Sequence, residues 1–268
     1  MTARGSRSDA WWCQLVVGHA AGATRKRAAD VARTPWGWML SSPAAPEVWI
    51  LNRAQIVPRA GGLPPEEVAD DVVARHRALG LRHVAADVRS SGDAATIGPA
   101  LARAGLTVAA LEVLVADPAA LLAGIPEPPG IVVAPAPPEE AVGLRHAGSA
   151  DLPEPERSQV AEQWALVPAD DVVHLLARDA DGAAVGAAVV HLASLHVELD
   201  DVLAHPDRRG RGVGTALVRA AAALAAARGA EGIGLLADPG DAAAAWYRRL
   251  GLRPVGTTVT AARAGADR

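Results

Sequence analysis

Hydrophobic positions recur along the chain at two spacings, and each spacing predicts one kind of element. Val213, Leu217, Ala221 and Leu224 recur about every 3.6 residues, which predicts a helix over residues 213–228. Short continuous apolar runs bounded by turn residues indicate buried strands instead. The chain alternates between the two patterns, as mixed α/β proteins do.

The C-terminal half carries the clearer elements. Residues 171–204 predict three strands, and Asp-Ala-Asp-Gly at 179–182 predicts a hairpin turn between the first two. We expect Gly251 to end the last helix of this half. Around these features the pattern predicts strands at 130–134, 232–238 and 253–261, and helices at 137–148, 154–166 and 241–252.

The N-terminal half repeats the later part of this order. Its pattern predicts strands at 47–57, 82–88 and 107–116, and helices at 64–80 and 97–106. The segments "ALARAGLTVAALEVLVA" (100–116) and "AWYRRLGLRPVGTTVTA" (245–261) both consist of a helix, Gly-Leu and a strand. This similarity indicates a degenerate internal duplication.

A proline-rich segment separates the two halves. Pro126, Pro128 and Pro129 fit neither a helix interior nor a central strand, so we expect a linker there. The predicted division is a flexible tail at 1–9, an N-terminal domain at 10–124, a linker at 125–129 and a C-terminal domain at 130–268.

Composition narrows the classes of partner. The net charge of −4 argues against a nucleic-acid-binding surface, and the single Cys13 fits a reducing cytosol. The segment "WWCQLVVGHAAGA" faintly resembles a signal peptide, but Gln14 and His19 interrupt its apolar run. The eight histidines show no metal-ligand spacing. We therefore expect a cytoplasmic protein, a monomer or a homodimer, without a metal, membrane or nucleic-acid partner.

A glycine-rich turn precedes the helix at 213–228. The first N–H groups of a helix lack partners and carry the positive end of its dipole, so Arg209, Gly212 and Gly214 could cradle an anion. The dinucleotide-binding pattern fails, because its sixth position falls on Thr215 or Leu217, and no lysine supports a P-loop. A turn without any ligand is the alternative interpretation.

The motifs around this turn resemble the GNAT superfamily, the general-control-related N-acetyltransferases. Arg209-Gly-Arg-Gly212-Val-Gly214 matches the R/Q-x-x-G-x-G/A signature for acyl-CoA, and "AWYRRLGLRPVG" matches Tyr-x-x-Leu-Gly-Phe with Leu252 in place of Phe. The resemblance covers about residues 129–262. It implies an α/β (α+β) fold with a mixed, mostly antiparallel sheet flanked by helices, in tandem with a degenerate N-terminal half.

The resemblance also implies acetyl-CoA as co-substrate and assigns residues to it. The backbone N–H groups of Val202, Leu203 and Ala204 would stabilise the oxyanion. The coenzyme would lie against Arg209, Gly210, Arg211, Gly212, Val213, Gly214, Thr215 and Asp241. Asp241 stands beside Gly240, the position where the family often has asparagine, and a helix cap is the alternative role for it.

Three residues are candidates for the chemistry. Tyr247 stands at the motif position that in the family lies near the sulfur of the coenzyme. Glu198 lies eleven residues before Arg209, where many members have a glutamate, and Asp200 would share its strand face. Asp201 would point to the other face unless a bulge intervenes, and the choice of base between Glu198 and Asp200 stays open.

We therefore predict an acyl-CoA-dependent N-acyltransferase. It would move an acetyl or other acyl group to the primary amine of a small molecule by direct attack of the amine on the thioester. The alternative is a catalytically weak acyl-CoA-binding or regulatory module.

Overall fold

The computed structural model describes residues 7–57, 62–165 and 171–264. Residues 1–6 of the predicted tail lie outside this part, and the first helix already begins at Asp9. The helices are α1 (Asp9–Arg27), η1 (Trp49–Leu51), α2 (Pro65–Ala78), α3 (Ser91–Arg103), α4 (Pro118–Gly124), η3 (Pro138–Ala141), α5 (Val142–Gly148), α6 (Glu156–Glu162), η4 (Pro206–Arg208), α7 (Val213–Ala227) and α8 (Ala242–Leu250). The strands are β1 (Asp30–Thr34), β2 (Gly37–Ser41), β3 (Ala54–Ile56), β4 (Val84–Val88), β5 (Thr107–Ala116), β6 (Val132–Pro135), β7 (Val172–Arg178), β8 (Ala184–Leu192), β9 (His196–Ala204), β10 (Gly232–Ala237) and β11 (Arg253–Arg263).

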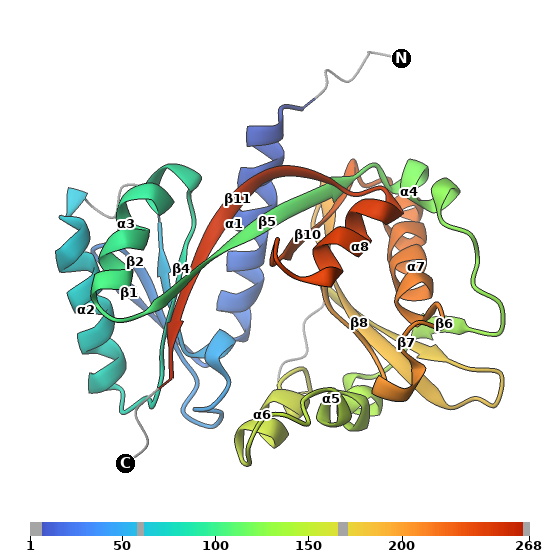
Figure 1. Cartoon of the computed structure of the whole chain (residues 1–268), viewed down its shortest axis with the longest axis horizontal. Helices are drawn as coiled ribbons and strands as arrows, with labels where there is room; N and C mark the ends of the chain where they lie inside the picture. Colours follow the sequence, from blue (N-terminus) through green and yellow to red (C-terminus); the bar gives the residue numbers. More distant parts are fainter. Residues whose placement is uncertain (1–6, 58–61, 166–170, 265–268) are drawn as a thin grey trace.

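Eleven strands of the described residues form one sheet, which runs across both halves of the molecule (Figure 1). Their order is β1-β2-β3-β4-β11-β5-β10-β9-β8-β7-β6. Neighbouring strands are antiparallel except in the pairs β3–β4 and β9–β10. The predicted fold class, a mixed and mostly antiparallel sheet flanked by helices, is confirmed.

The two halves exchange strands at the centre of the sheet. β11 comes from the C-terminal half but lies between β4 and β5, while β5 lies between β11 and β10 (Figure 1). Their antiparallel register runs from Arg253 opposite Val115 to Ala262 opposite Thr107. The strands of the two segments that suggested a duplication thus lie side by side. The division at residues 125–129 stays a prediction, and it falls between halves that share one sheet.

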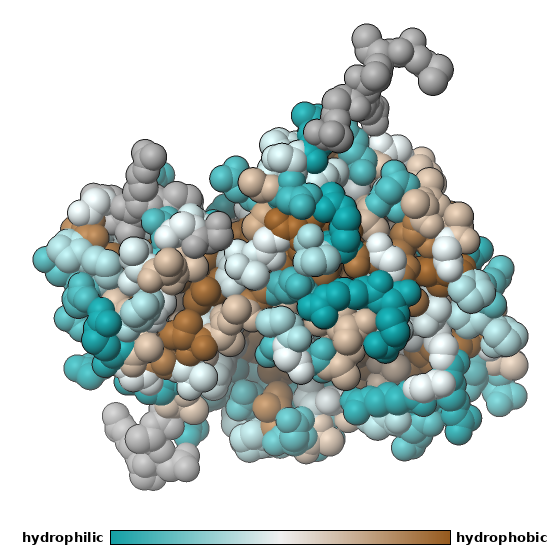
Figure 2. Space-filling view, turned by 45° about the horizontal axis from the view of Figure 1, so that its top comes forward, coloured by the Kyte–Doolittle hydropathy of each residue, from teal (hydrophilic) through white to brown (hydrophobic). Residues whose placement is uncertain are grey.

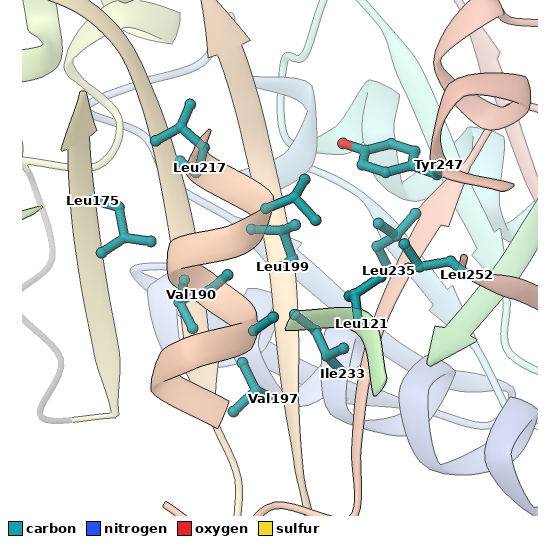
Figure 3. Packing of buried hydrophobic residues seen from close by; sticks show 14 of the residues in the cluster. Leu121, Leu175, Val190, Val197, Leu199, Leu217, Ile233, Leu235, Tyr247 and Leu252 are labelled. Atoms are coloured by element: carbon teal, nitrogen blue, oxygen red, sulfur yellow. The ribbon is translucent and has the colours of Figure 1, made fainter. Parts of the chain in front are cut away.

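Helices cover both faces of this sheet. α7 packs against β7, β8 and β9, where Leu217 and Leu199 belong to one core cluster with Leu235 of β10 (Figure 3). α2 and α3 cover the same face over the N-terminal half, around Val72 and Leu101. α1 lies on the opposite face, against β5, β10 and β11. The alternation along β5 shows this directly, because Val113 and Val115 contact the α1 cluster while Leu114 contacts the α7 cluster.

Three elements of the N-terminal half differ from the prediction. The expected strand at 47–57 is a turn of 3₁₀ helix, η1, followed by the short β3. The buried side chain of Asn52 explains this turn, because its amide donates to the carbonyls of Ala45 and Val48 at 2.8 and 3.0 Å. The β1–β2 hairpin and α4 were not predicted. β1 is exposed at four of its five positions, so it carries no hydrophobic pattern.

The surface is mixed in polarity. Figure 2 shows hydrophobic residues only in patches among hydrophilic ones on the face that it presents. Val31, Leu79 and Val132 are the large apolar side chains exposed in the described ranges. Over the same ranges, every helix is too short or too polar to cross a membrane.

Candidate functional site

The parallel strands β9 and β10 separate after a short pairing. They pair only from His196 opposite Gly232 to Glu198 opposite Gly234. Beyond this point β9 continues with β8 and β10 continues with β5. The facing edges of β9 and β10 therefore open like a wedge, and backbone groups of β9 past Glu198 are not used by β10. A cavity of about 260 Å³ lies beside this end of β9, between Val202–Ala204 and the helices α5 and α6, with Arg209 at its edge.

A β-bulge re-aims the side chains at the wedge. The register between β8 and β9 shifts at Asp201 and Val202, and Asp201 has a φ of 48°, in the left-handed region. Asp201 and Asp200 both line another cavity, of about 280 Å³, which also contacts Trp49 and Trp164, so the bulge keeps Asp201 off the opposite face that simple alternation predicts. Nε of the buried Arg145 donates to Asp201 at 2.7 Å and fixes this arrangement.

The start of α7 presents free backbone amides beside the wedge. Gly212 caps the helix with a φ of 84°, and Gly210 has a φ of 74°, so both positions favour glycine. The amides of Arg208 and Arg209 bond to carbonyls of their own turn. Within the described chain, no backbone acceptor outside α7 pairs with the amides of residues 210–215. With the exposed Arg209 beside them, these amides are suited to hold an anion, and the diphosphate of coenzyme A stays a prediction.

Neighbouring groups leave little space around the two glycines of α7. A Cβ at Gly212 would lie 3.1 Å from Cβ of Pro128, and one at Gly214 would lie 3.0 Å from the ring of Trp246. The glycines of the signature therefore serve packing as well as access to the backbone.

The pKa values of two carboxylates of β9, Glu198 and Asp200, are shifted in opposite directions. Glu198 is buried, and burial raises the pKa of its carboxyl even though Nδ1 of His19 lies 2.9 Å from its Oε2. Burial acts in the same direction on Asp200, but the interaction with His191, 3.5 Å away, and the charge of Arg27 outweigh it and lower the pKa of Asp200. Glu198 is therefore the stronger base of the two.

Tyr247 lies on α8, which follows β10. Its side chain is buried, and its hydroxyl points away from α8 toward the side where α7 and Leu217 lie (Figure 3). Burial raises the pKa of the phenol, as do the charges of Asp200 and Asp241, so the hydroxyl keeps its proton at neutral pH. Asp241 caps α8, since its Oδ1 accepts from the amide of Ala243 at 3.3 Å. This supports the capping role, and a contact of Asp241 with the coenzyme stays a prediction.

Several residues near the carboxylates were not expected from the sequence. They come from α1 and from the N-terminal half, and they are His19, Arg27, Arg53, Asp87 and Arg89. Of these residues, only His19 stands out in the sequence, because it interrupts an apolar run. No three or more His, Cys, Asp or Glu side chains group to hold a metal ion in residues 7–57, 62–165 and 171–264.

Comparison with known families shows what the part of the chain that carries β9, α7 and α8 is similar to. Residues 144–252 match the acetyltransferase (GNAT) family, and this part of the chain is a GNAT domain. A mycothiol acetyltransferase of Clavibacter michiganensis is 37% identical over 107 residues, which are 40% of this chain and 34% of that protein. The match thus spans about a third of the relative's length.

Solved structures extend the likeness in fold to both halves. A GCN5-related N-acetyltransferase from Kribbella flavida superposes with a TM-score of 0.62 at 22% identity, over 94% of this chain and 96% of that one. A protein of unknown function from Staphylococcus epidermidis gives 0.68 at 14%, over 87% and 93%. A tandem GNAT protein from the clavulanic acid biosynthesis pathway gives 0.54 at 16%, over 81% and 77%. The predicted GNAT-like character of the N-terminal half is therefore confirmed as a matter of fold.

Proposed function

We propose that this protein transfers an acetyl group from acetyl-CoA to the primary amine of a small molecule. The observation that carries the proposal is the wedge between β9 and β10, which opens beside the free amides of α7 and beside both candidate carboxylates. Acetyl is the group named for the 37% identical relative. The first half of the chain then completes the acceptor side of the site.

Different residues of the chain take part in the successive steps of the acyl transfer. Glu198 accepts a proton from the ammonium, because a protonated amine has no lone pair with which to attack. The amine nitrogen bonds to the thioester carbon, and backbone N–H groups of Val202 to Ala204 stabilise the oxyanion. The carbon–sulfur bond breaks and the attacking nitrogen loses its second proton. That proton either restores the one that Tyr247 donates to the departing thiolate, or reaches the thiolate itself while Tyr247 donates a hydrogen bond to the sulfur.

Glu198 suits the role of base better than Asp200 does. A base acts best when its pKa lies near the working pH, and burial moves the pKa of Glu198 in that direction. The pKa of Asp200 moves away from it. Asp200 instead faces the arginines described below and orients His191.

The test combines free-thiol release with a panel of small amines and direct binding of acetyl-CoA by calorimetry. We expect Glu198→Gln to lose about 100-fold or more in kcat with acetyl-CoA binding retained, and Tyr247→Phe to lose about 100-fold, since general acid–base groups contribute about 10²–10⁴-fold. Arg209→Glu should weaken acetyl-CoA binding. Arg228→Glu makes the same charge change at the far end of α7 and should not.

Two results would contradict the proposal. Tight acetyl-CoA binding without amine-dependent thiol release over the whole panel would favour the binding module. Unchanged acetyl-CoA affinity in Arg209→Glu would remove the coenzyme from the start of α7.

A further inference from the structure

A second cavity of about 180 Å³ lies between α1 and the middle of the sheet. The base candidates Glu198 and Asp200 line one part of it. Arg27, Arg53 and Arg89 line it as well, together with Asp87. The cavity therefore joins the carboxylates of the GNAT domain to cationic groups from the other half of the chain.

Three arginines and three carboxylates line the cavity, and of these carboxylates only Asp87 lies within ion-pair distance of the arginines. Oδ2 of Asp87 accepts from Arg53 at 2.9 Å and from Arg89 at 2.8 Å, so one carboxylate serves two guanidinium groups. Arg27 is held differently. Its Nη2 donates to Oε1 of Gln163 at 3.0 Å, and its guanidinium lies 3.4 Å above the centre of the Trp164 ring.

Arg27 is buried and Arg53 and Arg89 are half-buried, and each keeps an unused donor. The Arg89 side chain is 9% exposed and Arg27 as a whole is 6% exposed. In the described part of the chain, no group accepts a hydrogen bond from Nε of Arg27, Arg53 or Arg89. No described carboxylate lies within ion-pair distance of Arg27, although the charges of Asp200 and Asp201 act on it. Buried guanidinium donors without acceptors are unfavourable, so the arrangement is suited to a ligand that brings acceptor oxygens.

We propose that this cavity binds an oxyanion group, a carboxylate or a phosphate, that the acceptor carries next to its primary amine. The acceptor is then a small amino acid or an aminoalkyl phosphate rather than a plain amine. Its amine lies toward Glu198 and its anionic group toward Arg27, Arg53 and Arg89. This inference rests on the proposed acetyl transfer, and it narrows the class of acceptor.

The experiment compares acceptors that differ only in the anionic group. L-alanine is paired with L-alaninamide, and O-phosphoethanolamine with ethanolamine, each assayed by thiol release from acetyl-CoA. We expect the anionic member of one pair to have a kcat/KM about 10- to 100-fold higher, as for hydrogen bonds to charged groups. The pair that shows the preference distinguishes a carboxylate from a phosphate. Alaninamide has the less basic amine, so basicity alone would favour it over alanine.

Variants of the arginines test whether the preference for the anionic acceptor arises in this cavity. Arg89→Met leaves Asp87 paired with Arg53, and it should abolish the preference for the anionic member of the pair. Arg27→Met should reduce the preference too, without touching the Asp87 pair. Arg75→Met is the control, because it removes an arginine paired with Asp71 on α2, outside the cavity. Equal kcat/KM within both pairs, or a preference that survives Arg89→Met and Arg27→Met, would overturn the inference.

Failure of the acetyl transfer itself is recognised separately. If no acceptor releases thiol, the same four compounds are titrated by calorimetry against the protein saturated with coenzyme A. Binding of an anionic member that Arg89→Met abolishes would support the anion site with the proposed activity lost. Equal or absent binding of all four would reject the site.

Discussion

At the scale of single residues, the His19–Glu198 contact links α1 to the chemistry. His19 lies 2.9 Å from a carboxylate that burial makes more basic. The histidine side chain is 18% exposed and the glutamate side chain 7%, so their contact is largely shielded from solvent. His19 is a positioning residue, and its contribution is expected in the pH profile rather than in acceptor affinity.

Loss of His19 should raise the pKa of Glu198. Burial raises the pKa of Glu198 and His19 lowers it, so removing His19 leaves burial less opposed and raises the pKa further. The base works only when ionised. We therefore expect His19→Ala to move the acid limb of kcat/KM upward by about one to two pH units, the size of a charged hydrogen bond. His19→Gln keeps a donor and should move it less. A pH–rate profile identical to that of the wild type would exclude the role.

The motif residues and the acceptor residues differ in how far the sequence predicts them. Tyr247, Glu198 and Gly212 stand in one half of the chain at fixed spacings, and their assignment to one site stays a prediction. Arg53 and Arg89 carry no spacing of this kind. They meet Glu198 only because the sheet continues into the other half, and periodicity within one strand holds no information on that neighbour.

At the scale of elements, the position of α1 depends on two glycines of β10. A Cβ at Gly232 would lie 2.5 Å from the ring of Trp12, and one at Gly234 would lie 2.7 Å from Cγ2 of Val16. The bare backbone therefore lets α1 approach the sheet closely. Since α1 also carries His19 and Arg27, this approach helps to set the geometry of the acceptor cavity.

We expect Gly234→Ala to lower the free energy of unfolding by about 1–3 kcal/mol, because an added group overpacks a filled interface. Val16→Ala in the same chain should recover part of the loss, so the two changes should be non-additive. Urea unfolding of both single variants and the double variant measures this. Gly143→Ala in α5, where an added Cβ meets nothing within 4 Å, is the control. Additive effects would mean that Val16 does not limit the approach.

The elements were predicted where their pattern was strong. α7 and the three strands β7, β8 and β9 follow the sequence closely, because each buries a regular set of apolar residues. α4 was missed because it is short and stands next to the prolines. It nevertheless packs on α7 through Leu121, so the expected N-terminal domain ends in a helix that belongs to the other half's core.

At the scale of the whole molecule, the exchange of β5 and β11 joins the halves. The duplication was visible in the sequence, but the exchange was not, because two similar strands can pair within their own copy or across copies with the same local pattern. The pairing of Thr258 with Leu111 lies at the centre of the exchange, and both residues line the acceptor cavity. Substrate binding and the union of the halves therefore depend on the same strands.

We expect the chain to unfold in one cooperative transition. Trp164 and Trp246 are the only tryptophans after the proline-rich segment, so fluorescence reports mainly on the first half, while far-ultraviolet circular dichroism reports on both. The two urea curves should coincide. Residues 1–129 and 130–268 produced separately should be poorly soluble, and produced together they should elute as one complex. Two separate transitions, or a stable monomeric fragment, would show that each half folds alone.

The place of β11 in the chain has a consequence for synthesis on the ribosome. β4 and β5 emerge early, yet the strand that fills the gap between them follows every other strand of the sheet. Until it arrives, both carry open edges that can pair with a neighbouring nascent chain. Slow translation beyond residue 116 should therefore favour aggregation of the growing polypeptide, and its first half should depend on chaperones for longer than its length alone suggests.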